Sequence, residues 1–147
     1  MTKLLVSKPS WMPSNPSVKG SKLLGIKYEA KVINWLRTHY DETNILAGPW
    51  FEYEDERGLG WASPDFIVLD SKGVPVLIGE VKLSFKDRAE TKLRNIYQPL
   101  IEYHFQCSGT PLVQVTNSLN KRTPIKKVVN KFDDAFLHEY SIFRLNP

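Results

Sequence analysis

Asp65, Glu80 and Lys82 are the residues whose types and spacing could do chemistry together. Antiparallel pairing about a turn centred between Lys72 and Gly73 sets Asp65 opposite Glu80, because both positions are equally far from that centre. Directly opposed residues project from the same face, with Cβ atoms about 4.5–5.5 Å apart. Lys82 follows two residues after Glu80 and shares that face, since side chains alternate along a strand. The spacing predicts two carboxylates and an ammonium group at the open end of one hairpin.

A pair of neighbouring carboxylates repels unless a cation lies between them. Oxygen ligands suit a hard divalent ion, Mg²⁺ or Mn²⁺, which also binds phosphate oxygens. Such an ion polarises a phosphodiester and lowers the pKa of bound water. Lys82 could orient that water or offset charge in the transition state. On spacing alone, an exposed hairpin in which Lys82 forms a salt bridge with Asp65 or Glu80 fits equally well.

The elements that must position this hairpin follow from hydrophobic spacing. Residues 65–69 and 76–81 are β-branched runs around a turn signal, which predicts the hairpin itself. Apolar residues at helical spacing predict a helix over residues 21–38, which Ser21 could cap. Further expected elements are a strand at 49–53, a charged loop at 54–60, a helix at 88–105 kinked or broken by Pro99, and a strand at 112–116.

The C-terminal part is expected to form a third helix and a last strand. Thr123 and Pro124 are typical of a helix start. The expected buried stripe of this helix consists of Ile125, Val128, Val129, Phe132 and Phe136. Residues 141–145 are expected to form a final edge strand. The order of elements predicts an α/β fold with a central mixed sheet flanked by helices.

Charge is distributed in blocks along the chain, whose net charge is +4. Residues 1–40 hold seven Lys or Arg and one carboxylate, residues 41–60 hold six carboxylates and one Arg, and the remainder is basic again. Basic flanks around an acidic middle are typical of a polyanion-binding protein with a cation-binding centre. Residues 1–20, with three prolines, are expected to be an extended basic arm before a single domain at 21–147.

Several protein classes are excluded by composition. No apolar run is long enough for a membrane span, and the first residues lack the apolar block of a signal peptide. Cys107 is the single cysteine, which excludes a disulfide framework and a four-cysteine zinc or iron–sulfur site. We therefore expect a cytoplasmic protein with no membrane partner and no iron–sulfur cluster.

The chain resembles the PD-(D/E)XK nuclease superfamily. The resemblance is carried by Ser63-Pro64-Asp65, fourteen intervening residues, and Glu80-Val81-Lys82. Residues 25–29 are similar to the family's preceding GxxxE-type motif, and Gln98 fits a Gln-bearing helix that follows the lysine. The resemblance spans roughly residues 21–115. It implies a restriction-endonuclease-like α-β-β-β-α-β core.

The resemblance also implies roles for these residues. Asp65, Glu80 and the backbone carbonyl of Val81 would bind Mg²⁺ or Mn²⁺, and Lys82 would position or activate the attacking water. Glu29 would contribute through water or to a second metal ion. The alternative for Glu29 is a solvated helix residue among neighbouring lysines.

The branch within the superfamily stays open. RecB-like exonucleases carry a Gln and a Tyr four residues later, both facing the site; here the residue four after Gln98 is Glu102, Tyr103 follows it, and Pro99 intervenes. The lone Cys107 excludes the iron–sulfur members of that branch. A resolvase-like small nuclease, acting as a homo-oligomer, is equally compatible. The small core also resembles stand-alone nucleases of phages, plasmids and mobile elements, for which the host cytoplasm would be the compartment.

The expected partner is DNA, whether single-stranded, double-stranded or branched. Candidate contacts to it are Lys22, Lys27, Trp61, Arg88, Lys92 and Arg94. The cations would bind phosphates, and Trp61 would stack on a base. Solvated faces are the alternative for the cations. The function expected is a Mg²⁺-dependent deoxyribonuclease, exonuclease or endonuclease, specific for DNA structure or ends rather than for base sequence. The alternative is a non-catalytic nucleic-acid-binding domain that keeps the nuclease fold.

Overall fold

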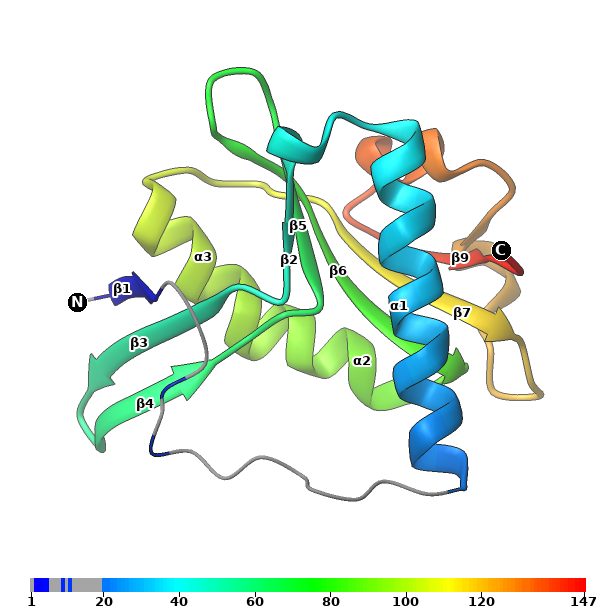
Figure 1. Ribbon diagram of the computed structural model, residues 1–147, viewed down its shortest axis with the longest axis horizontal. Coiled ribbons are helices and arrows are strands. Elements are labelled where there is room, and N and C mark those ends of the chain that lie inside the picture. The colour runs from blue at the N-terminus through cyan, green and yellow to red at the C-terminus, as the bar shows by residue number, and fades with distance from the viewer. Residues whose placement is uncertain (1, 6–8, 10, 12–19) are drawn as a thin grey trace.

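The computed structural model describes residues 2–5, 9, 11 and 20–147, and within them the chain has the expected α/β architecture (Figure 1). A six-stranded mixed sheet is flanked by three α-helices. Among the described residues, no helix is long and apolar enough to cross a membrane.

The large sheet has the strand order β2-β5-β6-β7-β9-β8. Its strands are β2 (Ile45–Ala47), β5 (Phe66–Leu69), β6 (Pro75–Ser84), β7 (Leu112–Ser118), β8 (Val128–Val129) and β9 (Tyr140–Arg144). The pairs β2–β5 and β5–β6 are antiparallel, whereas β6–β7, β7–β9 and β8–β9 are parallel. A smaller antiparallel sheet contains β1 (Thr2–Leu5), β3 (Trp50–Asp55) and β4 (Gly58–Ala62).

The helices cover both faces of the large sheet. Helix α1 (Ser21–His39) lies on one face, and α2 (Asp87–Lys92), the π-helical turn η2 (Leu93–Tyr97) and α3 (Gln98–Phe105) follow one another along the other. Short 3-10 turns complete the chain at η1 (Glu42–Asn44), η3 (Ile125–Lys127) and η4 (Phe132–Leu137).

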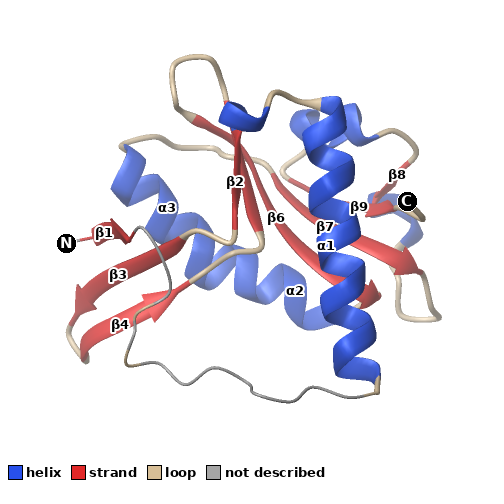
Figure 2. Cartoon of the chain, in the orientation of Figure 1, coloured by secondary structure: helices blue, strands red, loops and turns tan. Residues whose placement is uncertain are grey.

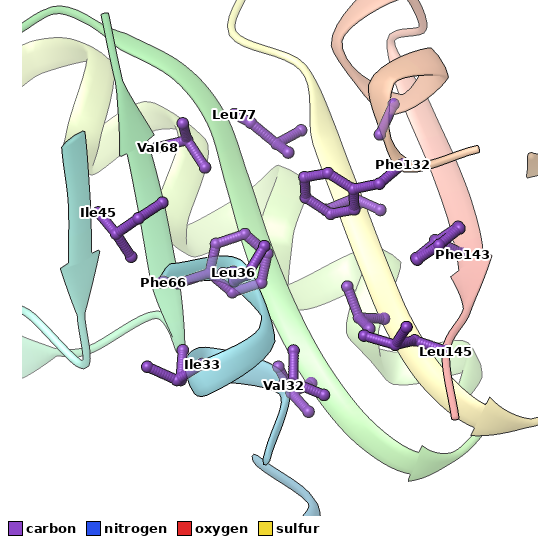
Figure 3. Packing of buried hydrophobic residues seen from close by; sticks show 14 of the residues in the cluster. Val32, Ile33, Leu36, Ile45, Phe66, Val68, Leu77, Phe132, Phe143 and Leu145 are labelled. Carbon is purple, nitrogen blue, oxygen red and sulfur yellow. The ribbon is translucent and has the colours of Figure 1, made fainter. Parts of the chain in front are cut away.

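Two apolar cores hold the layers together. On the α1 face, Val32 and Leu36 pack with Phe66, Leu77 and Phe132 (Figure 3). On the opposite face, a second cluster includes Leu93, Tyr97 and Ile101 from the helices and Ile67 and Ile78 from the strands. Strand β6 is buried over most of its length because both of its faces are covered, as expected for a strand inside a sheet.

Two predictions for the C-terminal part are wrong. The expected third helix is instead η3, strand β8 and η4 in succession, and Ile125 of its proposed buried stripe is 70% exposed. The β-branched pair Val128–Val129 joins the sheet by parallel pairing with β9. Strand β9 therefore lies between β7 and β8 and is not an edge strand.

Three local predictions change in detail. The expected charged loop at 54–60 is a hairpin turn, and β4 begins within it at Gly58. Gly20, not Ser21, occupies the N-cap position of α1. Of the expected arm at 1–20, residues 2–5 pair with β3 as β1, and most of the remainder lies outside the described residues.

Candidate active site

The β5–β6 hairpin has the register that its sequence predicts. Phe66 pairs with Gly79 and Ile67 with Ile78, so Asp65, directly before β5, is level with Glu80. A register shift lies between Val68 and Leu69, at the turn end of the hairpin. The irregularity is thus remote from the open end, where the two carboxylates meet.

A close ring contact fixes this register beside the carboxylates. A Cβ atom built on Gly79 would lie 2.0 Å from Cζ of Phe66, so the ring occupies the space where a side chain would be. Only glycine leaves room for the ring at this cross-strand position. Because Phe66 follows Asp65 and Gly79 precedes Glu80, the contact holds both acidic residues in place.

Asp65 and Lys82 are tied to the strand that carries Glu80. Oδ2 of Asp65 accepts a hydrogen bond from the backbone N–H of Val81 at 2.7 Å. The ammonium Nζ of Lys82 lies 3.6 Å from Oε2 of Glu80. The Glu80 side chain is only 3% exposed, whereas that of Lys82 is 36% exposed. The three side chains predicted to converge therefore do so, with the carboxylate of Glu80 deepest.

Glu29 reaches the same group from α1. Burial, followed by the negative charge of Asp65, raises the pKa of Glu29 to about 7. The same causes raise the pKa of Glu80 to about 7, against the opposing effect of Lys82 and Lys92. The carboxyl groups of Glu29 and Glu80 are each near enough to that of Asp65 to share a proton with it. Three carboxyl groups thus share one partly dehydrated space.

The donor chemistry of this space fits a hard divalent cation. Within the described part of the chain, no three His, Cys, Asp or Glu side chains already have the spacing of a coordination shell. The carboxylates of Asp65, Glu80 and Glu29 nevertheless converge, and the raised pKa values of Glu29 and Glu80 indicate that the negative charge of the group is not balanced by the protein alone. A cation between them would supply that balance.

Tyr97 is a site residue that the sequence did not indicate. Burial and then the charges of Glu80 and Asp65 raise the pKa of its phenol, which places the ring beside both carboxylates. Lys92, expected only as a phosphate contact, lies with its Nζ 5.4 Å from the centre of the Tyr97 ring and lowers the pKa of Glu80. The helical segment α2–η2, on the face of the sheet opposite α1, thus contributes the ammonium group of Lys92 and the phenol of Tyr97.

Gln98 is not brought to this group. Its Nε2 donates to the carbonyl oxygen of Thr110 at 2.8 Å, so it supports the loop before β7. The reason is the π-helical turn η2, which directly precedes it. A π turn holds one residue more than an α turn and therefore rotates the following residues around the helix axis. Tyr97, the last residue of that turn, faces the carboxylates instead.

A hollow of about 530 Å³ gives access to the carboxylates. Glu29, Asp65, Lys92, Tyr97 and Trp61 are among the residues that line it. Two of the expected nucleic-acid contacts therefore lie at the hollow. The indole N–H of Trp61 donates to a carboxylate oxygen of Glu52 on the neighbouring strand β3.

The other expected nucleic-acid contacts lie elsewhere. Arg94 forms ion pairs with Glu90 at 2.8 Å and Glu139 at 3.0 Å. Lys22, Lys27 and Arg88 are exposed.

Comparison of the chain with protein-family models, with curated proteins and with solved structures gives no match. What the site can do therefore follows from its own residues. The carboxyl groups of Glu29 and Asp65 line one hollow together with Lys92 and Tyr97. Glu80 and Lys82 lie beside Asp65, on the neighbouring strand of the hairpin. This set can bind a divalent cation, place an anionic ester beside it and orient a water molecule.

Proposed function

We propose that this protein is a Mg²⁺- or Mn²⁺-dependent nuclease that hydrolyses phosphodiester bonds of DNA, and that it is a member of the PD-(D/E)XK superfamily. The observation that carries the proposal is the convergence of Asp65, Glu80, Lys82 and Glu29 from three separate elements. A surface salt bridge would need only Lys82 and one carboxylate. It would not bring a partly buried acid from α1 to the same point.

The order of elements supports the same proposal. Helix α1, strands β2, β5 and β6, the helical segment α2–η2–α3 and strand β7 follow one another as α-β-β-β-α-β. The small sheet of β1, β3 and β4 is then an addition, since β3 and β4 are inserted between β2 and β5. The acidic residues lie at the start of β5 and within β6, the positions that the resemblance implies.

The mechanism assigns a task to each side chain. Asp65, Glu80 and the carbonyl of Val81 would hold the divalent ion, which supplies Lewis-acid activation of the phosphate and of a water molecule. Lys82, held 3.6 Å from Glu80 and partly exposed, orients the attacking water. Lys92, which lines the hollow, offsets the negative charge that develops on the phosphate oxygens.

Cleavage assays with the purified protein test the proposal. DNA should be cut in Mg²⁺ or Mn²⁺ and left intact in EDTA, and a comparison of linear, circular, single-stranded and branched DNA identifies the preferred form. Asp65→Asn and Lys82→Ala should each reduce the rate by about 100-fold or more, in the range typical of lost electrostatic or acid–base groups. Lys126→Ala is the matched control, because Lys126 is exposed and belongs to η3, outside the hollow.

Undiminished cutting by both site variants would refute the mechanism. Salt-sensitive binding without cleavage in either metal ion would favour the non-catalytic nucleic-acid-binding domain. Thermal melting of each variant shows that a loss of activity is not a loss of folding.

A further inference from the structure

A trough leads away from the carboxylates along the small sheet. Beside the hollow that holds Glu29 and Asp65 lies a second hollow of about 550 Å³. Tyr53 and Ile96 line both hollows, so the two hollows adjoin. The trough runs where the β1–β3–β4 sheet lies alongside the helical segment α2–η2–α3 (Figure 2).

Aromatic side chains line this trough along its length. Trp50 and Trp61 lie at the end that holds Asp65, Tyr53 lies at the junction, and Tyr103 lies at the far end with 57% of its surface exposed. Bases of single-stranded nucleic acids stack on such rings, and the stacking tolerates any sequence because every base has a π face. A duplex cannot use these rings, because its base faces are already stacked on one another.

Two of the rings are held in position by contacts across the small sheet. The indole N–H of Trp61 donates to Oε2 of Glu52 at 3.1 Å, and the two residues are directly paired in register. Tyr53 lies over Gly60, where a Cβ atom would come within 2.4 Å of its ring. Rings that are already positioned lose little conformational entropy when a base stacks on them.

The charges of the trough also favour a single strand over a duplex. Its cations are Lys92 in the hollow of the carboxylates and Arg57 in the second hollow, where Glu54 and Asp55 add negative charge. Duplex DNA presents one phosphate charge for about every 1.7 Å of its axis, and proteins that grip it neutralise many of them. A single strand with its bases on the aromatic wall can direct its phosphates outward, away from Glu54 and Asp55.

We propose that this trough binds one unpaired strand of DNA by base stacking and leads it to the carboxylate site. Cleavage of the bound strand rests on the proposed nuclease function, whereas binding of the strand in the trough does not. It narrows the substrate class to DNA with an unpaired segment, and it makes Tyr53, Trp61 and Tyr103 substrate-binding residues.

Binding is measured on the full chain in EDTA, so that no cleavage occurs. Fluorescence anisotropy compares a labelled single-stranded DNA of about 16 nucleotides, the upper range for one such binding site, with its blunt duplex and with single-stranded RNA of the same sequence. The single-stranded DNA should bind at least about tenfold more tightly than the duplex.

Two variants test the rings separately from the carboxylates. Tyr103→Ala removes one stacking surface and should weaken binding of the single strand by about 5- to 100-fold, in line with the loss of one stacked base. Gly60→Ala pushes the Tyr53 ring away without removing an aromatic residue and should weaken binding in the same direction. Leu137→Ala is the matched control, because Leu137 is 79% exposed and lies on η4, away from both hollows.

Each outcome bears on one proposal at a time. Equal or tighter binding of the duplex, unchanged binding by Tyr103→Ala and Gly60→Ala together, or a preference for RNA would overturn the inference. Tight binding of single-stranded DNA with no cleavage in any divalent ion would support strand binding in the trough and contradict the proposed nuclease activity. Metal-dependent cutting of duplex and single-stranded DNA at equal rates would support the proposed nuclease activity and contradict the role of the trough.

Discussion

Glu80 illustrates how burial changes the behaviour of a single carboxyl group. Its side chain is nearly inaccessible, and the negative charge of Asp65 lies beside it. Both effects favour the protonated form, so its pKa rises to about 7. In a protein without a bound cation, this residue therefore opposes folding at neutral and alkaline pH.

The first prediction concerns the pH dependence of stability in the metal-free protein. The pKa values of Glu29 and Glu80 are about 7 in the folded chain and about 4.3 when unfolded. The folded state binds more protons between these values, so stability is highest at low pH and declines as the pH rises through 7. Thermal melting in EDTA from pH 5 to pH 8 should show this decline.

Adding Mg²⁺ or Mn²⁺ should reverse the decline. A cation that binds the ionised carboxylates stabilises the folded state, and more strongly at pH 8 than at pH 5. A melting temperature that changes with neither pH nor added metal ion would contradict the proposed cation site.

A substitution at Glu80 gives the second prediction. Glu80→Gln keeps the shape of the side chain and removes its buried charge, which should stabilise the metal-free protein at pH 8 by about 1–3 kcal/mol. The same variant should lose the stabilisation by Mg²⁺. Urea unfolding at pH 8, with and without the ion, measures both effects. A less stable variant that still responds to Mg²⁺ would show that Glu80 is not a ligand.

At the scale of elements, the hairpin is defined by a cross-strand contact as well as by its turn. The Phe66 ring lies directly over Gly79, and this contact sits one residue inside the Asp65–Glu80 pair. A slip of one residue would turn every side chain to the opposite face of the strand. The ring contact therefore helps to keep both carboxylates on the face that carries the hollow.

The third prediction follows from that contact. Gly79→Ala places a methyl group 2.0 Å from the Phe66 ring, so the ring or the strand must move. The expected result is a loss of about 2–4 kcal/mol of stability, with weaker Mg²⁺ binding because Asp65 shifts with Phe66. Chemical denaturation and metal titration measure the two effects.

Gly25→Ala is the control for this substitution. Gly25 lies within α1, and no atom comes within 4 Å of a Cβ atom built there. Alanine is the better helix former by about 1 kcal/mol, so this variant should be more stable than the parent. If Gly79→Ala and Gly25→Ala changed the stability by the same amount, the role of the Phe66 ring contact would be contradicted.

The helical segment on the other face shows how one proline redirects side chains. Pro99 has no N–H and cannot continue a regular α-helical bond pattern, and its ring would crowd the carbonyl four residues earlier. The π-helical turn η2 lies directly before α3, where Pro99 is one of the first residues. The widened turn accommodates the proline and rotates the helix so that Tyr97, not Gln98, faces Glu80.

At the scale of the whole molecule, several of the cations counted in the sequence are paired with carboxylates. Arg94 and Lys127 both form ion pairs with Glu90, at 2.8 Å and 3.2 Å, and Arg122 lies 3.5 Å from Asp87. Paired cations attract phosphate less than free ones do. These three cations are therefore less available to phosphate than their number in the sequence suggests.

The fourth prediction is a shallow salt dependence of DNA binding. If Lys92 and Arg57 are the cations that meet the strand in the trough, two phosphates are neutralised. The logarithm of the association constant should then fall with the logarithm of salt concentration with a slope of about −1 to −2. Anisotropy titrations from low to physiological salt measure this slope. A slope near −6 would indicate that the protein neutralises many backbone phosphates and does not bind mainly by base stacking.

The sequence predicted the β5–β6 hairpin well because its signal is local. A turn, two β-branched runs and strict alternation suffice to place Asp65 opposite Glu80 with Lys82 on the same face, and the structure has that register. The amphipathic spacing of α1 likewise placed Glu29 on a helix whose apolar face packs on the sheet. The hairpin register and the helix both depend on residues that are close together in the sequence.

The tertiary structure decided which residues from distant segments complete the site. Lys92 reaches the carboxylates from α2, and Tyr97 reaches them from a π-helical turn that periodicity does not reveal. Phe66 contacts Gly79 only once the strands pair. The segment after Thr123 has apolar spacing that fits a helix, yet Val128–Val129 gain backbone hydrogen bonds by pairing with β9. Parallel pairing depends on strands far apart in the chain, so local spacing could not indicate it.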